Sequence, residues 1–326
     1  MTTSMRRQTA KAQPAIPVST AGSVLDSLSV RNFRGVIQGT IGGFRALNVL
    51  AGRNGCGKST VLDAAYLALS GDSGALSAVG YRRTLRGDLA TTYLVPFGRS
   101  ATIEIAATLG DVDVGFSAEW GGGGGTSRHI APKEWKAPRV RFVGVRRDEK
   151  DLEEAFAAVA DLGAEAVERL EQLVRAAHPG VRRILTRMQA DNTRPYLSLV
   201  VNEGSYPIHV AGDGLQRLFL VACHAATLKG GVLLIEEPEA HQHPAYLTLL
   251  ARVLAEAARS GTQVIFTTHS LELIDRILEA TAEVGEEALS QTAVHLITLE
   301  GGRLAGRLMG ADDAAKAREA VQLELR

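Results

Sequence analysis

Hydrophobic and polar residues alternate in short blocks from residue 24 onward, and glycines separate the blocks. Apolar runs at 24–30, 36–41 and 47–50 have the length and composition of β-strands. A helical pattern follows over 60–69 and stops at Ser-Gly-Asp-Ser-Gly, a strong helix-ending sequence. The first part of the chain therefore predicts three strands and then a helix.

The middle of the chain predicts strands at 102–109 and 112–118, joined by a Gly110-Asp111 hairpin turn. Five consecutive glycines at 121–125 predict a loop tip, because the interiors of strands and helices disfavour such a run. Next we expect a strand, amphipathic helices broken near Gly163 and a short antiparallel set, at 140–145, 148–177, 182–188, 196–201 and 206–210.

The last third of the chain alternates helices with strands, which predicts an α/β fold with a mostly parallel sheet covered by helices. Two closing strands are expected within 293–309, followed by a helix over 311–323. Both chain ends then build a single domain over 23–326, with about 75–210 as an inserted lobe and 1–22 as a disordered tail. The alternating elements are expected at 214–228, 231–236, 244–259, 263–268, 271–282 and 293–299.

Composition narrows the possible classes of function. The 326 residues include 36 Lys and Arg against 36 Asp and Glu, which excludes a uniformly basic coat for nucleic acid. Two cysteines exclude a disulfide scaffold. No apolar stretch is long enough to cross a membrane, and no apolar segment of a secretory signal follows the charged N-terminus. A cytoplasmic protein without a membrane partner is expected.

The strongest chemical signal is a glycine-rich turn between the strand at 47–50 and the helix at 60–69. Its glycines allow successive backbone N–H groups to point at one anion, and the helix N-terminus adds a favourable dipole. Lys58 would reach the β- and γ-phosphates, and the Ser59 hydroxyl would bind Mg²⁺. The turn matches the phosphate-loop pattern G-x-x-x-x-G-K-[ST] and reads Gly52, Arg53, Asn54, Gly55, Cys56, Gly57, Lys58, Ser59 and Thr60.

Two adjacent carboxylates follow the apolar run Val232–Ile235, where the carboxyl end of a buried strand would lie. Ligands of α/β sheets bind at this edge. We assign Glu236 to the metal ion, directly or through water, and Glu237 to polarising the attacking water. The alternative is a surface acidic cluster that opens a turn.

Two further polar segments are candidates for the same site. His269 ends another apolar run and is placed to contact a γ-phosphate or the attacking water, or else has a purely structural role. Gly212 and Gly214 flank Asp213 at the start of a predicted helix. This turn is either a second anion cradle or an ordinary helix N-terminus capped by Asp213.

The order of these motifs resembles the ABC-type ATPases, in the branch of SMC heads, RecF-like proteins and OLD-family ATPases. The segment Leu28–Gly35 resembles the first strand of that branch, and Glu236–Pro244 resembles its acidic strand and D-loop. Thr268-His269-Ser270 is similar to the switch histidine, and Gly212–Gln216 stands where the signature motif belongs. The resemblance covers about 30–70 and 205–300.

The resemblance implies an α/β P-loop NTPase, an ABC-type head with a mixed sheet and an inserted helical and antiparallel lobe. It implies ATP and Mg²⁺ as ligands and Glu237, Lys58 and His269 as catalytic residues. Two chains would pair head to tail, so that each phosphate loop, with ATP, faces the partner's Gly212–Gly214 turn.

Three departures from the family pattern change the picture. Glu236 replaces the usual Asp, and Gly212 replaces the signature serine. No glutamine occurs between Gln38 and Gln172, so the usual Q-loop ligand is missing, which argues against a transporter subunit. The segment after Ser270 is too short for the TOPRIM nuclease domain of OLD-type proteins.

We therefore expect a stand-alone OLD/SMC-like ATPase whose nucleotide-dependent dimerisation controls a separate effector, such as a nuclease in anti-phage defence or DNA maintenance. The alternatives are an ATP-dependent scaffold with little hydrolysis and a transporter nucleotide-binding subunit. Clustered arginines outside the loop either line a DNA path or form solvated faces balanced by acids. They are Arg82, Arg83, Arg86, Arg139, Arg141, Arg146, Arg147, Arg182, Arg183 and Arg187.

Overall fold

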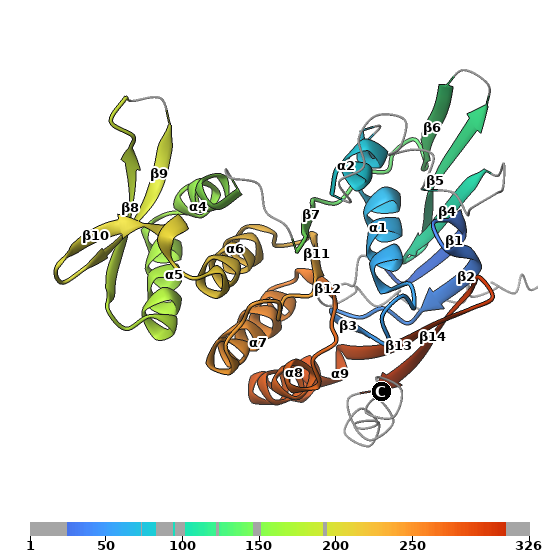
Figure 1. The fold of residues 1–326 in the computed structure, drawn as a ribbon. Coiled ribbons are helices and arrows are strands. Elements are labelled where there is room, and N and C mark those ends of the chain that lie inside the picture. Colours follow the sequence, from blue (N-terminus) through green and yellow to red (C-terminus); the bar gives the residue numbers. More distant parts are fainter. Residues whose placement is uncertain are drawn as a thin grey trace, which may run out of the picture.

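A mixed sheet organises the computed structural model, which describes residues 25–72, 74–82, 94, 102–121, 124–145, 151–191 and 194–310. Eleven strands of this described part are hydrogen-bonded in the order β6-β5-β4-β1-β2-β14-β13-β3-β12-β11-β7 (Figure 1). The mixed α/β fold predicted from the sequence is therefore confirmed.

The expected tail over 1–22 and helix over 311–323 lie outside the described residues. The strands are β1 (Ser27–Phe33), β2 (Val36–Gly42), β3 (Leu47–Ala51), β4 (Ile103–Leu109), β5 (Val112–Gly121), β6 (Gly124–Ile130), β7 (Val140–Val143), β11 (Val232–Glu236), β12 (Gln263–Thr267), β13 (Thr292–Glu300) and β14 (Arg303–Gly310).

Parallel pairing is concentrated at one side of the sheet, where β7, β11, β12, β3 and β13 are parallel neighbours. Antiparallel pairs dominate at the other side, from β6 to β2. The central parallel strands β3, β11 and β12 are buried along their whole length because helices cover both of their faces. One face packs against α1 (Lys58–Leu69), and the other packs against α6 (Asp213–Thr227), α7 (Pro244–Arg259) and α8 (Leu271–Val284) (Figure 1).

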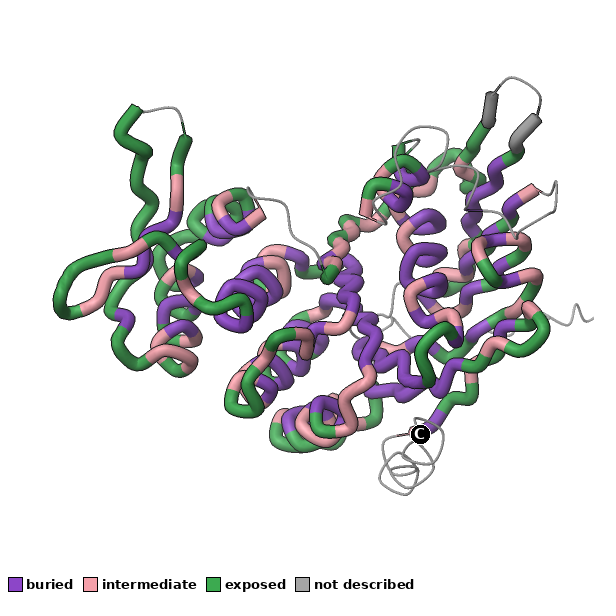
Figure 2. Tube along the Cα trace, in the orientation of Figure 1, coloured by how far each residue is buried: buried purple, intermediate pink, exposed green. Residues whose placement is uncertain are grey.

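Strand β11 shows how both faces are used. Val232 and Leu234 belong to the hydrophobic cluster around α1, whereas Leu233 and Ile235 belong to the cluster around α6 and α7. All four side chains are fully buried, and the centre of the sheet is buried throughout (Figure 2). The end of this strand is thus fixed by packing from two sides.

The expected insertion at 75–210 is divided between two sheets. β4 pairs with β1, and β7 pairs with β11, so residues 103–143 extend the main sheet. A separate lobe follows the segment 146–150 and contains α4 (Asp151–Ala160), α5 (Ala164–Ala177) and a three-stranded antiparallel sheet (Figure 1). That sheet consists of β8 (Val181–Met188), β9 (Pro195–Val201) and β10 (Gly204–Pro207). The remaining helices are α2 (Ala75–Arg82), α9 (Glu286–Ser290) and the 3₁₀ turn Ile208–Val210.

The outer glycines of the run belong to strands. Gly121 ends β5 and pairs with Gly124, and Gly125 of β6 pairs with Trp120 of β5. The expected loop over 121–125 is therefore shorter at both ends, because ladder pairing outweighs the weak strand propensity of glycine, and residues 122–123 lie outside the described residues. The β4–β5 hairpin is confirmed, with Gly110 in the left-handed conformation at its turn (φ 61°). None of the helices in the described ranges has the length and apolar character that a membrane crossing needs.

A histidine inside the sheet makes stability depend on pH. His295 is fully buried, lies 3.4 Å from the Asn48 side chain and packs 4.9 Å from the Phe44 ring. Burial, helped by Arg45, lowers the pKa of His295 to about 4. In the unfolded chain this histidine has a pKa near 6.5. Between about pH 6.5 and 4 the unfolded state therefore holds more protons than the folded state, and the free energy of unfolding falls as the pH falls.

We expect the titration of His295 to lower the free energy of unfolding by about 2 kcal/mol when the pH falls from 7 to 5. His295→Phe should shrink the difference between the two pH values by that amount, since phenylalanine does not titrate. Denaturant unfolding at both pH values measures it. An unaltered pH difference in His295→Phe would contradict this account.

Candidate functional site

The phosphate loop connects the fully buried strand β3 to the N-terminus of α1. Gly52, Gly55 and Gly57 all have positive φ angles, of 141°, 78° and 96°. Residues other than glycine rarely adopt positive φ angles, so the backbone of this loop requires glycine at these three positions. A Cβ on Gly52 would also lie 2.5 Å from the carbonyl oxygen of Ile297 in β13. The loop is therefore shaped by its own backbone and by a neighbouring strand.

Lys58 is the first residue of α1 and is 5% exposed, although Arg53, Asn54 and Gly55 before it are exposed. Its Nζ donates hydrogen bonds to the carbonyl oxygens of Gly52 at 2.7 Å and Arg53 at 3.0 Å. Burial lowers the pKa of Lys58, and the nearby Cys56, Glu237 and Glu239 oppose that effect. The ammonium group thus sits inside the loop, close to the carboxylates from the far end of the chain.

The other loop residues differ in exposure. Ser59 is half-buried, Thr60 is buried, and the Cys56 thiol lies 4.0 Å from the Lys58 ammonium. The Cys56 backbone N–H donates to the Arg53 carbonyl at 3.3 Å, a bond within the loop.

The acidic pair lies at the carboxyl edge of the same parallel sheet. Glu236 is the last residue of β11, is 8% exposed and pairs with Thr267 of β12. Glu237 has a left-handed backbone (φ 47°), and its N–H donates to the carbonyl and the hydroxyl of Thr267, both at 3.1 Å. A left-handed backbone at a residue other than glycine is characteristic of functional sites, because surrounding contacts must hold it.

His269 joins the two halves of the site. Its Nδ1 is 3.5 Å from Lys58 Nζ, and its Nε2 is 3.4 Å from Glu237 Oε1. Lysine can only donate, so Nδ1 accepts and the ring proton resides on Nε2, facing the carboxylate. Lys58, His269 and Glu237, which are far apart in the sequence, therefore form one continuous chain of contacts.

Glu239 was not predicted as a site residue, and it orients the histidine. Its Oε1 accepts hydrogen bonds from the Thr268 hydroxyl at 2.6 Å and the His269 N–H at 2.8 Å. Its Oε2 is buried and has no hydrogen-bond partner within the described residues. The sequence does show Glu239 as the third acidic residue of Glu-Glu-Pro-Glu. However, the turn after β11 decides which of these carboxylates reaches the end of β12, and the sequence alone does not define that turn.

Arg217 is a second residue that the sequence analysis missed. It is 3% exposed on α6, and its guanidinium donates to the carbonyl oxygens of Glu236 and, at 3.0 Å, Glu237. It also donates to the carbonyls of Gly144 at 3.0 Å and Val145 at 3.4 Å. One arginine therefore holds the backbone that carries both acidic residues.

We expect Arg217→Met to lower the free energy of unfolding by about 2–4 kcal/mol, because buried carbonyls lose their donors. The rate of ATP hydrolysis should fall more than the affinity for ATP, since Glu237 loses support while the phosphate loop does not. Denaturant unfolding measures the stability, phosphate release measures the rate of hydrolysis, and nucleotide titration measures the affinity. Arg252→Met removes an arginine whose side chain is 58% exposed and should change neither. Equal stability of the two variants would contradict this role.

The predicted signature turn lies apart from the phosphate loop, at the N-terminus of α6 on the side of the lobe (Figure 1). Gly212 is exposed, and a Cβ there would contact nothing within 4 Å. Gly214 is buried against the segment after β11: its carbonyl accepts from the Gln242 amide at 3.1 Å, and a Cβ would lie 2.9 Å from the His241 oxygen. Within one chain, this turn contacts the D-loop segment.

The residues at this edge fit a nucleoside triphosphate with Mg²⁺. The positive φ angles of Gly52, Gly55 and Gly57 give the loop the curled backbone, ahead of a helix N-terminus, that suits a bound phosphate. The Ser59 hydroxyl and the Glu236 carboxylate are oxygen ligands of the kind that Mg²⁺ prefers.

Parts of the chain are similar to known protein families and to one curated protein. Two family models match, "AAA domain, putative AbiEii toxin, Type IV TA system" over residues 135–275 and "AAA domain" over residues 27–120. An uncharacterised protein of Methanocaldococcus jannaschii, MJECL11, is 31% identical over 116 residues, which cover 35% of this chain and 98% of that protein.

Solved structures with a similar fold include SMC heads. A head bound to the C-terminal winged-helix domain of ScpA has a TM-score of 0.62 at 15% identity, covering 90% of this chain and 100% of that one. A head with an extended coiled coil, bound to the C-terminal domain of ScpA from Pyrococcus furiosus, has a TM-score of 0.57 at 14% identity, covering 91% and 99%. Two segments of the chain therefore match AAA-domain families, and the chain has the fold of SMC heads, which is an ABC-type ATPase fold.

Proposed function

We propose that this protein binds ATP with Mg²⁺ at the phosphate loop and hydrolyses it to ADP and phosphate. The observation that carries the proposal is the contact chain from Lys58 through His269 to Glu237, at 3.5 and 3.4 Å. It brings a phosphate-binding cation and a carboxylate base together at the edge where α/β sheets bind ligands.

Each side chain has a distinct task in this proposal. Lys58 stabilises negative charge on the β- and γ-phosphates, and Glu237 accepts a proton from the water that attacks the γ-phosphorus. His269 orients Glu237 and contacts the γ-phosphate. Ser59 and Glu236 would hold Mg²⁺, which neutralises phosphate charge when bound.

A homodimer is the second part of the proposal. In a head-to-tail pair, the phosphate loop of one copy faces the Gly212–Gly214 turn of the other, and ATP lies between them. The exposure of Gly212 and of Val210, at 73%, supports this role, because an apolar side chain beside an open helix N-terminus suits a partner surface. ATP closes the dimer, and hydrolysis opens it.

The dimer would act on a separate effector in the cytoplasm, a nuclease in anti-phage defence or DNA maintenance. Two observations support a partner protein: the similar SMC heads are bound to ScpA domains, and one matching family model is described with a toxin of a type IV toxin–antitoxin system. Neither similarity identifies the partner of this protein.

A scaffold that assembles on ATP with little hydrolysis is the second candidate. Gly212 supplies no signature hydroxyl, and Glu236 is one methylene longer than the usual aspartate, so both departures favour slow turnover.

Phosphate release and molar mass, measured on the same sample, test the proposal. With ATP and Mg²⁺ we expect steady phosphate release and a shift from monomer to dimer. Dimer formation without phosphate release would favour the scaffold, and the absence of both would overturn the proposal.

A further inference from the structure

The three-stranded sheet of the lobe has one covered face and one open face. Ile184, Leu197 and Leu199 are buried on the inner face, against α4 and α5. Those helices lie between the sheet and α6, so the outer face points away from the ATPase body (Figure 1). No described element covers that outer face, and much of the lobe's surface there is exposed (Figure 2).

Strand register places a regular pattern on the outer face. Arg183, Leu185 and Arg187 alternate along β8 and are all exposed. In β9, Tyr196 lies directly opposite Arg187, and Val200 lies opposite Arg183; both are half-exposed. Neighbours on one face of a sheet are in contact range, so arginine and apolar side chains alternate along and across this surface.

The charge of this face is unbalanced. Residues 181–207 contain four arginines, two carboxylates and no lysine, whereas α4, α5 and their connection carry seven carboxylates and two arginines. Arg183 and Arg187 form no ion pair with any carboxylate of the described ranges. The lobe is therefore polarised, with an acidic helical side and a basic sheet side.

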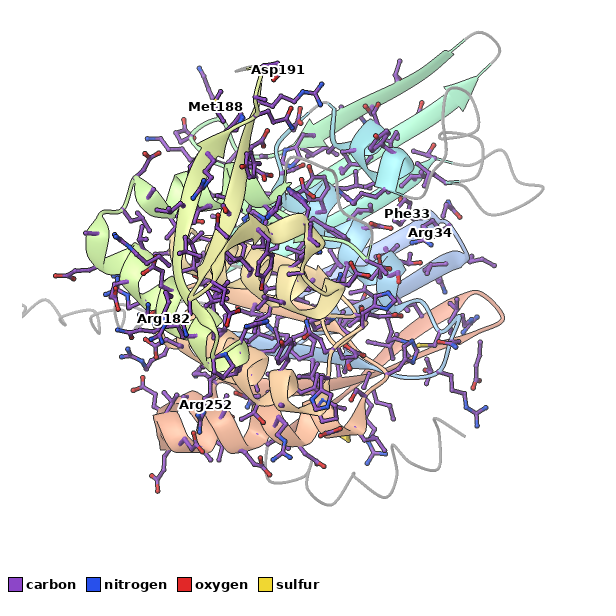
Figure 3. The ribbon with its side chains drawn as sticks, turned by 60° about the vertical axis from the view of Figure 1, so that its left-hand side comes forward. Phe33, Arg34, Arg182, Met188, Asp191 and Arg252 are labelled. Carbon is purple, nitrogen blue, oxygen red and sulfur yellow. The ribbon has the colours of Figure 1, made fainter. Side chains whose placement is uncertain are left out.

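The arrangement extends along the whole β8–β9 hairpin. In Figure 3 this hairpin lies toward the viewer, with Arg182 near one end and Met188 and Asp191 at the other. Arg194 is exposed at the start of the returning chain, next to β9. Eight residues of extended strand span about 25 Å, enough for several nucleotides of an extended strand.

We propose that the outer face of β8–β10 binds single-stranded nucleic acid. Arg183 and Arg187 contact phosphates, and Tyr196, Leu185 and Val200 contact the faces of unstacked bases. A duplex hides its base faces and would leave these apolar side chains uncovered. Flat sheets with aromatic and arginine side chains bind single strands in this way.

We expect this face to discriminate little between DNA and RNA or between base sequences. Apart from the arginines and the single hydroxyl of Tyr196, its polar side chains are Ser198, which is buried, and Ser205. Neither provides the paired donors and acceptors that distinguish bases or a 2′-hydroxyl. Single-stranded DNA and RNA should bind alike, as expected for contacts to phosphates and base faces.

Fluorescence anisotropy with the full chain and labelled oligonucleotides of about 12 nucleotides tests the proposal. We expect similar affinity for single-stranded DNA and RNA of one sequence, and binding to the corresponding duplex that is at least about tenfold weaker. Affinity should fall with salt, with a logarithmic slope of about −0.7 for each phosphate contacted.

Two variants separate charge from stacking. Arg183→Gln with Arg187→Gln should reduce the magnitude of the salt slope by about 1.4. Tyr196→Ser should weaken binding about fivefold or more and leave the slope unchanged. The matched control combines Arg169→Gln with Arg252→Gln, which removes the same charge from exposed positions on α5 and α7 and should change neither quantity. Circular dichroism verifies that each variant is folded.

Equal binding of duplex, a strong preference for one sugar, or equal losses in the control variant would overturn the proposal. So would competition by a polyglutamate peptide as effective as that by unlabelled oligonucleotide, because it would identify a general anion surface. The assay contains no ATP, and Lys58→Met should bind oligonucleotides like the wild type. Failure here is therefore distinguishable from failure of the proposed ATPase.

Discussion

Glu237→Gln is expected to lower the rate of ATP hydrolysis by about 100-fold or more while leaving the affinity for ATP within about threefold. Glutamine has the shape of glutamate but cannot accept a proton from water. The Glu237 backbone is fixed by Thr267 and Arg217, so the substituted side chain should occupy the same place. The ATP-bound dimer should accumulate, because closure persists when hydrolysis stops.

Phosphate release under saturating ATP measures the rate, and titration with a fluorescent ATP analogue measures the affinity. Glu272→Gln is the matched control. Glu272 lies in the first turn of α8, shortly after His269, and its side chain is 45% exposed. Its loss should leave both quantities unchanged. Undiminished phosphate release by Glu237→Gln would remove Glu237 from the reaction.

Lys58→Met should weaken ATP binding by about 100-fold or more, because a charge-assisted contact to phosphate is lost. The sequence predicts an exposed loop in which Lys58→Ala would abolish nucleotide binding and leave the fold intact, but the structure buries the lysine side chain. Lys58→Ala would therefore leave a cavity as well as remove the charge. Methionine fills a similar volume and isolates the effect of the charge.

Calorimetric titration with ATP and Mg²⁺ measures this loss, and thermal unfolding tests whether the fold is retained. Lys229→Met provides the comparison, since Lys229 is exposed at the end of the turn before β11 and should not affect binding. ATP affinity of Lys58→Met equal to that of the wild type would mean that the phosphate loop has another function.

Local patterns in the sequence predicted the elements around the site well. The strand, glycine turn and helix at residues 47–69 are encoded by neighbours in the chain, and so are the apolar strands that end at Glu236 and Thr267. Buried parallel strands have unbroken apolar runs, and helices have their own periodicity, so each could be recognised separately.

The contacts that complete the site were not predictable in the same way. Arg217 reaches carbonyl oxygens 19 and 20 residues further along the chain, and Glu239 bonds Thr268 and His269, 29 and 30 residues away. Such pairs arise only when α6, β11 and β12 pack together, and backbone carbonyls leave no trace in a sequence. The strand β6 was missed for a related reason, since its glycines and polar residues owe their conformation to β5.

The left-handed backbone at Glu237 has a consequence for how this protein can evolve. A residue there must tolerate a conformation that β-branched side chains resist, and it must also supply a carboxylate. Few codon changes from glutamate meet the first condition. Inactive descendants that stay folded should therefore carry glycine, asparagine, aspartate or glutamine at this position, rather than valine, isoleucine or threonine.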